Sequence, residues 1–308
     1  MSRQKNIEKA LPDISQYFSN NPKNVYSHHD FENDIELYRE LWNIPQRYNS
    51  YHFEDFLTQK QILDHIQLKF PNKKYNFFIC KNTSIYEIAQ SLHKHCYFSH
   101  FTAMYLNDLT EQVPRNLYIS IEQPRKHHSD IELLQENIDY AFSKPMRRSN
   151  NTAQLKDHNI TITNTVASNG LGIYRQIFHD YGYLSVTTLE RTLLDCTIRP
   201  SYSGGCFEIL KAYKRAKDKI SVAKLLGLYK QLKFIYPYHQ AIGFYLEIAG
   251  YSDTQIERFY KIPINHNFYL AYDMKNPSYS KKWHLYYPKE MEISYKDLQQ
   301  NRNKNQNL

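Results

Sequence analysis

The chain has 308 residues, of which 41% are hydrophobic and 23% charged, and no window approaches the roughly 18 consecutive apolar residues of a membrane span. These values are typical of a soluble globular protein with roughly two domains. The first residues lack the apolar core of a secretory signal, and the four cysteines lie far apart, with no CxxC pair. We therefore expect a cytoplasmic protein that contacts no membrane and has neither a disulfide nor a structural zinc site.

The formal net charge of +8 favours an acidic partner such as nucleic acid. Residues 1–80 hold ten Lys and Arg against ten Asp and Glu, so the surplus of positive charge lies beyond them. This charge balance argues against a strongly basic DNA-binding domain in the first quarter of the chain but does not exclude DNA binding there. DNA affinity depends instead on which charges share one face.

Residues 1–82 show the pattern of three helices followed by two strands. Apolar residues at helical spacing predict a helix over residues 4–19 with a break or restart at Pro12, a second after Ser27, and a third capped by Ser50. Strands over residues 62–70 and 75–80 then flank a turn. This order is the outline of a winged helix-turn-helix domain, whose third helix enters the major groove while the hairpin lies along the DNA backbone.

The side chains available for DNA contact lie around the third helix and on the hairpin. Arg reads guanine or phosphate, Asn reads adenine edges and Lys neutralises phosphate. The predicted DNA-binding residues are Arg47, Asn49, Ser50, Tyr51, His52, Lys60, Lys69, Lys73 and Lys74. The alternative is a small helical domain whose hairpin docks on the rest of the chain or on a protein partner, so that the domain is an adaptor.

A second domain is predicted over residues 83–290, followed by a polar tail over residues 291–308. Ser84 and Glu87 form a capping box for its first helix, Gly243 lets a neighbouring element approach a later helix, and Gly250 ends that helix. Further helices are expected near residues 99–106, 130–141, 221–232, 236–249 and 253–260, and strands near residues 97–98, 116–121, 159–166, 170–178, 183–186, 267–272 and 283–287. The chain is therefore expected to be α+β, with a mixed α/β second domain.

The stretch from residue 182 to residue 205 carries the strongest local signals. A capping box at residues 187–190 that uses Glu190 predicts a helix from Thr188. Arg191, Asp195 and Arg199 recur every four residues as a ladder of alternating charge, and a proline at position 200 ends the helix.

A second amphipathic helix follows the glycine pair at positions 204 and 205. Its spacing points Phe207 into the core and places Lys211, Lys214 and Arg215 on an outer basic face. Such a face is either a solvated surface or a contact for nucleic acid or an acidic protein.

Two patterns could indicate a metal site or a ribonuclease. Four potential ligands cluster at His93, His95, Cys96 and His100. Their spacing does not place three ligands on one face of a helix or a strand. Arg47 and His52 match the R-x4-H pattern of some small ribonucleases, which chance produces often in a chain with 14 His. Neither pattern supports a site.

Paired carboxylates could instead serve a metal-dependent nuclease. Asp180, Glu190 and Asp195 are the candidates, but the cap and the charge ladder already use the last two. Gly204 and Gly205 could cradle a phosphate, but two glycines are a weak signal and a close-packed corner is the favoured interpretation. We therefore predict no catalytic residue, no metal and no cofactor, and a nuclease is the least favoured function.

Three motifs resemble those of the AbiEi-type antitoxins of type IV toxin-antitoxin systems. TTLERTLLDCTIRPSYSGG resembles the central segment of that family, YFSHFTAMYLNDL its S-H-x-(S/T)-A helix, and YPYHQAIGFYLEIAGY its G-(F/Y)-x-L-E helix. The similar region covers residues 83–288, and Asn107 and Asp108 stand where the family has His-Gly. The motif residues to which we assign a structural role are Glu190, Arg191, Asp195, Arg199, Gly204 and Gly205.

The resemblance implies a bifunctional bacterial antitoxin that acts in phage defence and is not an enzyme. Its winged helix would bind inverted repeats in its own promoter, with two protomers on one operator, and repress the operon. Its second domain would counteract a nucleotidyltransferase-like toxin without requiring a stable complex.

Overall fold

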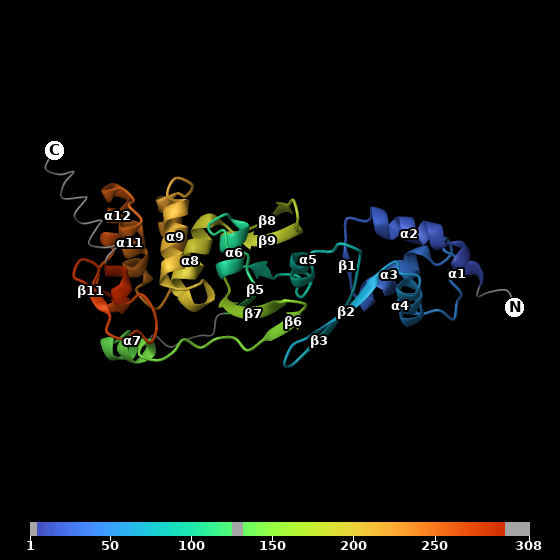
Figure 1. Cartoon of the computed structure of the whole chain (residues 1–308), viewed down its shortest axis with the longest axis horizontal. Coiled ribbons are helices and arrows are strands. Elements are labelled where there is room, and N and C mark those ends of the chain that lie inside the picture. The colour runs from blue at the N-terminus through green and yellow to red at the C-terminus, as the bar shows by residue number, and fades with distance from the viewer. Residues whose placement is uncertain (1–4, 125–131, 293–308) are drawn as a thin grey trace. The chain divides into compact units, whose positions relative to one another are not determined.

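The computed structural model describes residues 5–124 and 132–292 (Figure 1). The chain divides into two compact units. The smaller unit comprises Met1–Lys94, Asn151–Ile160 and Gln176–Leu184, and the larger unit comprises His95–Asn150, Thr161–Arg175 and Ser185–Leu308. The domain limits drawn from the sequence stay predictions, and the expected polar tail lies almost wholly outside the described residues.

The N-terminal part of the smaller unit combines helices with a three-stranded antiparallel sheet of order β1-β3-β2. Its described elements are α1 (Lys5–Lys9), α2 (Leu11–Asn20), β1 (Val25–Tyr26), α3 (His28–Tyr38), α4 (Ser50–Gln59), β2 (Asp64–Lys69) and β3 (Lys74–Ile79). Pro12 lies in the first turn of α2, where its missing N–H is tolerated, so the predicted first helix restarts there.

Side-chain caps set the first residues of α3 and α4. The Asp30 carboxylate accepts a hydrogen bond from the Ser27 N–H at 2.7 Å, which completes the capping box of α3. The cap predicted for α4 is wrong by one residue. Asn49 caps the helix by accepting from the His52 N–H at 3.2 Å, and Ser50 is already the first helical residue. The asparagine reaches the free N–H groups of the first turn from the position before the helix.

Aromatic rings fill the space between these helices and the sheet. Phe31 of α3 is fully buried, and its ring centroid lies 5.1 Å from that of Phe78 on β3 and 6.0 Å from that of Phe53 on α4. The Trp42 ring stacks on Phe53 at 5.7 Å. These contacts fix α4 and the base of the β2–β3 hairpin against α3.

A six-stranded sheet of order β6-β7-β5-β4-β9-β8 follows. Its strands are β4 (Tyr97–Phe98), β5 (Asn116–Gln123), β6 (Thr152–Leu155), β7 (His158–Val166), β8 (Ile173–Phe178) and β9 (Gly182–Thr187). The helices in this part of the chain are α5 (Ile85–Gln90), α6 (His100–Leu106) and α7 (Gln135–Phe142). The predicted capping box at the start of α5 is confirmed, because the Glu87 carboxylate accepts from the Ser84 N–H at 3.0 Å.

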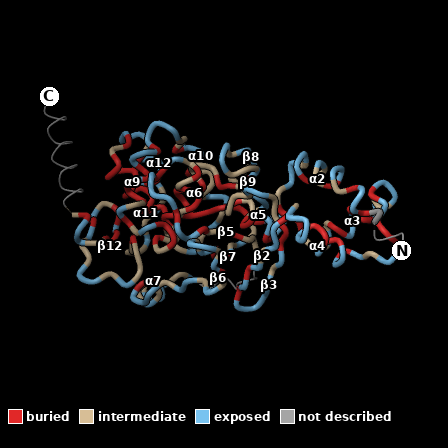
Figure 2. Tube along the Cα trace, turned by 45° about the vertical axis from the view of Figure 1, so that its right-hand side comes forward, coloured by how far each residue is buried: buried red, intermediate tan, exposed pale blue. Residues whose placement is uncertain are grey.

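The rest of the larger unit is a helical cluster with a small sheet of order β10-β12-β11. Its elements are α8 (Leu189–Ile198), a 3-10 turn (Pro200–Tyr202), α9 (Cys206–Ala216), α10 (Val222–Leu232), α11 (Tyr238–Ile248), α12 (Asp253–Tyr260), β10 (Phe268–Tyr269), β11 (Ser278–Ser280), β12 (Leu285–Tyr287) and a second 3-10 turn (Lys289–Met291). Every residue of α11 is buried, as the red trace of this helix shows (Figure 2). A Cβ at Gly243 would lie 2.1 Å from the Trp283 ring, so the predicted close approach is confirmed. Gly250 ends α11 with a φ of +78°.

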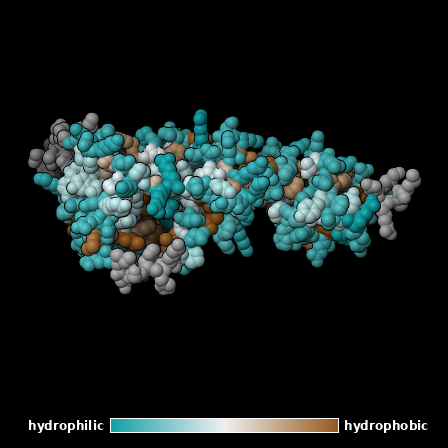
Figure 3. All heavy atoms as spheres, turned by 90° about the horizontal axis from the view of Figure 1, so that it is seen from below, coloured by the Kyte–Doolittle hydropathy of each residue, from teal (hydrophilic) through white to brown (hydrophobic). Residues whose placement is uncertain are grey.

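The α+β class predicted from the sequence is confirmed. The sequence pattern does not predict the strands β1, β6 and β11, which have two to four residues each. Within the described ranges, no helix is long and apolar enough to cross a membrane. Figure 3 shows hydrophilic side chains over most of the surface of both units, with apolar side chains gathered in a hollow of the larger unit.

Candidate nucleic-acid interface

Helix α4 presents a short polar face whose residues are partly used inside the domain. Tyr51 is 63% exposed, and His52 is exposed beside it. Asn49 spends its side-chain oxygen on the cap, because it accepts from the backbone N–H of His52 and lies 2.6 Å from the ring Nδ1 of the same residue. Ser50 is buried, with its hydroxyl 3.1 Å from His28 Nε2. Tyr51 and His52 are therefore the side chains of the predicted helix that reach outward most freely.

The tip of the β2–β3 hairpin concentrates three exposed lysines. Lys69 and Lys74 face each other directly across the two strands, and neither pairs with a described carboxylate. Lys73 occupies the turn, with its Nζ 4.3 Å from the centre of the Tyr75 ring. Like charges placed opposite each other destabilise a hairpin. A bound anion would relieve this repulsion.

The alternation of side chains places this lysine pair on the helical side of the sheet. Phe78, Asn76 and Lys74 alternate along β3 and so share one face. Phe78 packs on Phe31 of α3, while Asn76 accepts a hydrogen bond from Gln67 at 2.9 Å further along the hairpin. The face that begins against the helices therefore ends in the lysine pair.

Arg47 and Lys60 flank α4 at its two ends. Arg47 is exposed in the loop before the helix and forms no ion pair with a described residue. Lys60 ends the helix and is paired with Glu8 at 2.9 Å. Arg47 is thus available to a phosphate, whereas Lys60 would have to leave its carboxylate.

Helices α3 and α4 are themselves acidic. They contain no Lys or Arg, and their six carboxylates are Asp30, Asp34, Glu32, Glu36, Glu54 and Asp55. Glu54 lies 2.6 Å from His28, and Asp30 is paired with Lys23, so part of this charge is used within the domain. Among the predicted DNA-binding residues, the cations without a described ion pair are consequently Arg47, Lys69, Lys73 and Lys74.

The family-motif residues of α8 form internal contacts. The Arg191 guanidinium donates to the Asp195 carboxylate at 2.8 Å, and the two side chains are 4% and 9% exposed. Burial raises the pKa of Asp195, and the neighbouring Arg191 limits the rise. Arg191 also donates to the Leu171 carbonyl at 2.6 Å. This half of the predicted charge ladder is confirmed.

Arg199 does not complete that ladder. Helix α8 ends at Ile198, so the Arg199 side chain leaves the helical face and donates to the Asn164 carbonyl at 3.3 Å. The predicted capping box is also wrong, because Thr188 is the cap and Glu190 therefore stands one position too early to close it. Glu190 accepts instead from the Ser221 N–H at 3.0 Å, at the start of α10.

Gly204 and Gly205 form the predicted corner. Their φ angles of +77° and +87° lie in the left-handed region that favours glycine. The Gly205 N–H donates to the Pro200 carbonyl at 2.9 Å, so it is already used within the corner. A phosphate cradle would need this N–H free.

The basic face predicted on α9 is exposed but mostly paired. Lys211 lies 2.6 Å from Glu208, and Arg215 lies 2.7 Å from Glu111, which leaves Lys214 as the member without a described ion pair. Phe207, predicted to be buried, is 44% exposed, because the helix turns Cys206 and Ile209 inward in its place.

The potential metal ligands do not gather into a site. No group of three His, Cys, Asp or Glu side chains suitable for a metal ion occurs in the part of the chain that the structure describes. His100 is 2% exposed, lies 2.8 Å from the Ser99 hydroxyl, and has its pKa lowered by burial. It is a buried neutral imidazole of the core.

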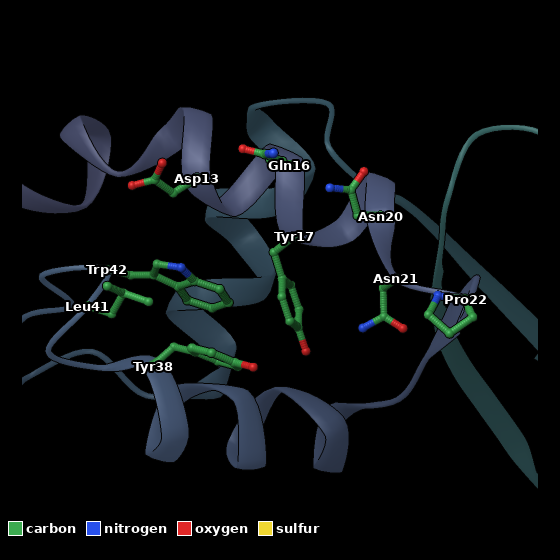
Figure 4. A pocket seen from close by; sticks show the side chains of 9 residues that line it. All are labelled: Asp13, Gln16, Tyr17, Asn20, Asn21, Pro22, Tyr38, Leu41 and Trp42. Carbon is green, nitrogen blue, oxygen red and sulfur yellow. The ribbon is translucent and has the colours of Figure 1, made fainter.

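A cavity in the smaller unit escapes prediction from the sequence. It has a volume of about 440 Å³ and lies between α2 and the end of α3, where the Tyr17, Tyr38 and Trp42 rings cluster (Figure 4). The Tyr17 hydroxyl donates to Asp34 at 2.9 Å, and burial raises the pKa of that carboxyl. Three aromatic residues on two helices are an ordinary core pattern, so the sequence offers no signal for a hollow here.

Comparison with known proteins identifies a structural neighbour. No family model matches the chain, and no curated protein matches it in sequence. The chain is similar to the crystal structure of the RV2827C protein from Mycobacterium tuberculosis, with a TM-score of 0.56, 10% identity and 90% of each chain covered. The two proteins share a fold. At this identity the similarity carries no information about function, which has to be argued from the residues of this chain.

Proposed function

We propose that the chain is a DNA-binding transcriptional repressor and the antitoxin of a type IV system. The order helix, strand, helix, helix, hairpin in α2 to β3, with β1 paired to β3, supports the proposal because a winged helix has the same order. In this arrangement α4 is the recognition helix and the β2–β3 hairpin is the wing.

The observation that carries the DNA-binding half is the lysine pair at the wing tip. Lys69 and Lys74 are exposed, opposed and unpaired, on the face of the sheet that packs against the helices. Such a pair destabilises the hairpin by itself but suits two phosphates of a duplex. Arg47 supplies a further cation before α4, and Tyr51 and His52 are the outward side chains that would reach base edges.

The antitoxin half rests on the resemblance of residues 83–288 to the AbiEi family. In that role the second domain opposes a nucleotidyltransferase-like toxin, and the winged helix represses the operon through inverted repeats. Two half-sites call for two protomers on one operator. In this proposal the buried Arg191–Asp195 pair and the glycine corner have a structural role in the second domain.

A gel shift tests the repressor half directly. The full chain is titrated on its own upstream DNA and on a scrambled duplex at two salt concentrations. We expect preference for the upstream DNA, a large loss of affinity in the Lys73→Ala, Lys74→Ala double variant, and a smaller loss in Arg47→Ala. A double variant that binds as tightly as the natural chain would exclude the wing as the contact.

A matched control removes one charge from the other end of the wing. Lys81 is exposed and follows β3 at the end opposite the turn, so Lys81→Ala should leave the shift unchanged. Equal losses in Lys81→Ala and Lys74→Ala would mean that only net charge matters. The antitoxin half is tested by expressing the chain together with a nucleotidyltransferase-like toxin and measuring growth, which the chain should restore.

A second candidate function is a protein-binding adaptor, which the acidic α3–α4 pair favours. The exposed carboxylates of these helices are Glu32, Glu36 and Asp55, and neither helix contains Lys or Arg, which suits a basic protein surface better than a phosphate backbone. Leu37 of α3 and Leu41, which follows this helix, are 74% and 67% exposed. This function gains support if the wing variants retain repression while Leu37→Asp abolishes it.

A further inference from the structure

The larger unit contains a cleft of about 1340 Å³ that no motif of the sequence indicates. Its walls come from four segments that lie far apart in the chain, namely residues 140–149, 163–166, 191–202 and 232–238, with one residue each from two further places. All of these residues belong to the larger unit. The cleft exceeds the volume of roughly 300–1,000 Å³ that a typical small-molecule site occupies.

The cleft is lined by six cations and a single carboxylate. The cations are Lys144, Arg147, Arg148, Arg191, Arg199 and Lys233, and the carboxylate is Asp195. Asp195 forms a buried ion pair with Arg191. The other five cations form no ion pair with any carboxylate that the structure describes. Unpaired cations around one hollow repel each other, and an anionic ligand relieves that repulsion.

Exposed apolar side chains line the same cleft as these cations. Tyr140, Val166 and Ile235 are 69%, 57% and 65% exposed, and all three line the cleft. The Lys144 ammonium lies 5.3 Å from the centre of the Tyr140 ring. A ligand that fills the cleft therefore needs both anionic groups and flat apolar surface.

From this combination we infer that the cleft binds single-stranded nucleic acid. Phosphates of the strand contact the unpaired cations, and bases lie against Tyr140 and the apolar wall. An intact duplex hides its base faces in the stack and could use only the cations. An acidic peptide would leave the apolar wall without a planar partner. The inference concerns the larger unit and is independent of duplex binding by the wing.

The test is fluorescence anisotropy of labelled 12-nucleotide strands, poly-U and poly-dT, titrated with the full chain. The Arg147→Ala, Arg148→Ala double variant removes two exposed loop charges. It should weaken binding at least tenfold and reduce the slope of log affinity against log salt by about 1.4, which is about 0.7 for each phosphate contact. Tyr140→Ala should weaken binding by roughly five- to 160-fold, because one stacking partner is lost.

Two controls separate this site from other basic surfaces. Lys214→Ala with Lys217→Ala removes the same charge from exposed positions of α9 and its end, outside the cleft, and should leave the affinity within twofold. The wing variant Lys73→Ala, Lys74→Ala should also bind single strands normally, so failure of duplex binding and failure of this inference give different results. Thermal unfolding of each variant checks that the fold is intact.

The inference is overturned if Arg147→Ala, Arg148→Ala loses no more affinity than the α9 control. It is equally overturned if a duplex of the same length binds the cleft as tightly as a single strand. Displacement of poly-U by polyglutamate with the same number of negative charges would overturn it as well. Binding of uridine monophosphate alone, with no gain from a longer strand, would also contradict it and would indicate a mononucleotide site.

Discussion

If the buried Arg191–Asp195 pair has a structural role, its removal should lower the free energy of unfolding of the larger unit. Replacing Asp195 by Asn leaves a buried guanidinium without its carboxylate at 4% exposure. Removing one partner of a buried ion pair costs about 3–5 kcal/mol of unfolding free energy. Arg191 keeps the Leu171 carbonyl at 2.6 Å, so we place Asp195→Asn at about 3 kcal/mol.

The paired replacement Arg191→Met, Asp195→Leu should be much milder than either single change. It removes both charges together, and apolar side chains of similar size recover much of the packing. The expected coupling between the two sites is about 2 kcal/mol or more. If the double variant loses as much free energy of unfolding as the two single variants added together, the ion pair is not the source of the effect.

Urea unfolding followed by tryptophan fluorescence measures these free energies. The sequence has two tryptophans, Trp42 in the smaller unit and Trp283 in the larger, and both are buried. In a Trp42→Phe background the signal reports the larger unit alone. A loss below about 1 kcal/mol in Asp195→Asn, or a stable folded variant that has lost an enzymatic activity, would refute the structural role.

Three further predictions concern stability. Burial lowers the pKa of His239 to about 4, whereas the same side chain in the unfolded chain has a pKa near 6.5. The folded state therefore loses stability as the pH falls from about 6.5 to 4, by up to about 3 kcal/mol. Urea unfolding at several pH values should show a smaller loss of stability in His239→Gln. Gly243→Ala places a Cβ against the rigid Trp283 ring and should lower the free energy of unfolding by about 2 kcal/mol, despite the better helix propensity of alanine. The tryptophan emission should also shift, and unchanged emission would argue against the contact. Asn49→Ala removes the cap of α4 and should cost about 1 kcal/mol in unfolding of the smaller unit, while an effect near zero would mean that His52 holds the helix end by itself.

Local sequence signals predict the helices of this chain well. The helix start after Ser27, the capping box at Ser84, the proline restart of α2 and the glycine after α11 all act within a few residues of the helix end. They succeed because the free N–H and C=O groups of a helix end must be satisfied by nearby atoms. The errors at Asn49 and Thr188 are shifts of one residue between two competent caps.

The candidate sites are less accessible from sequence. Periodicity predicts the hairpin lysines, but the opposition of Lys69 and Lys74 follows from strand register, which depends on the whole hairpin. Arg199 fits a helical ladder in the sequence and leaves it because α8 ends one residue earlier. The cleft joins residues near positions 148 and 233, and no local pattern links segments brought together only by folding.

The central claim is that the wing and the loop before α4 hold the phosphates of duplex DNA. The most direct measurement is the salt dependence of the affinity of the full chain for its upstream duplex. Four phosphate contacts from Arg47, Lys69, Lys73 and Lys74 predict a slope of about −3.6, or a loss of about 150-fold between 50 and 200 mM salt, and Lys73→Ala with Lys74→Ala should reduce the slope to about −1.8. A slope that is the same in the double variant and in the natural chain would contradict the claim.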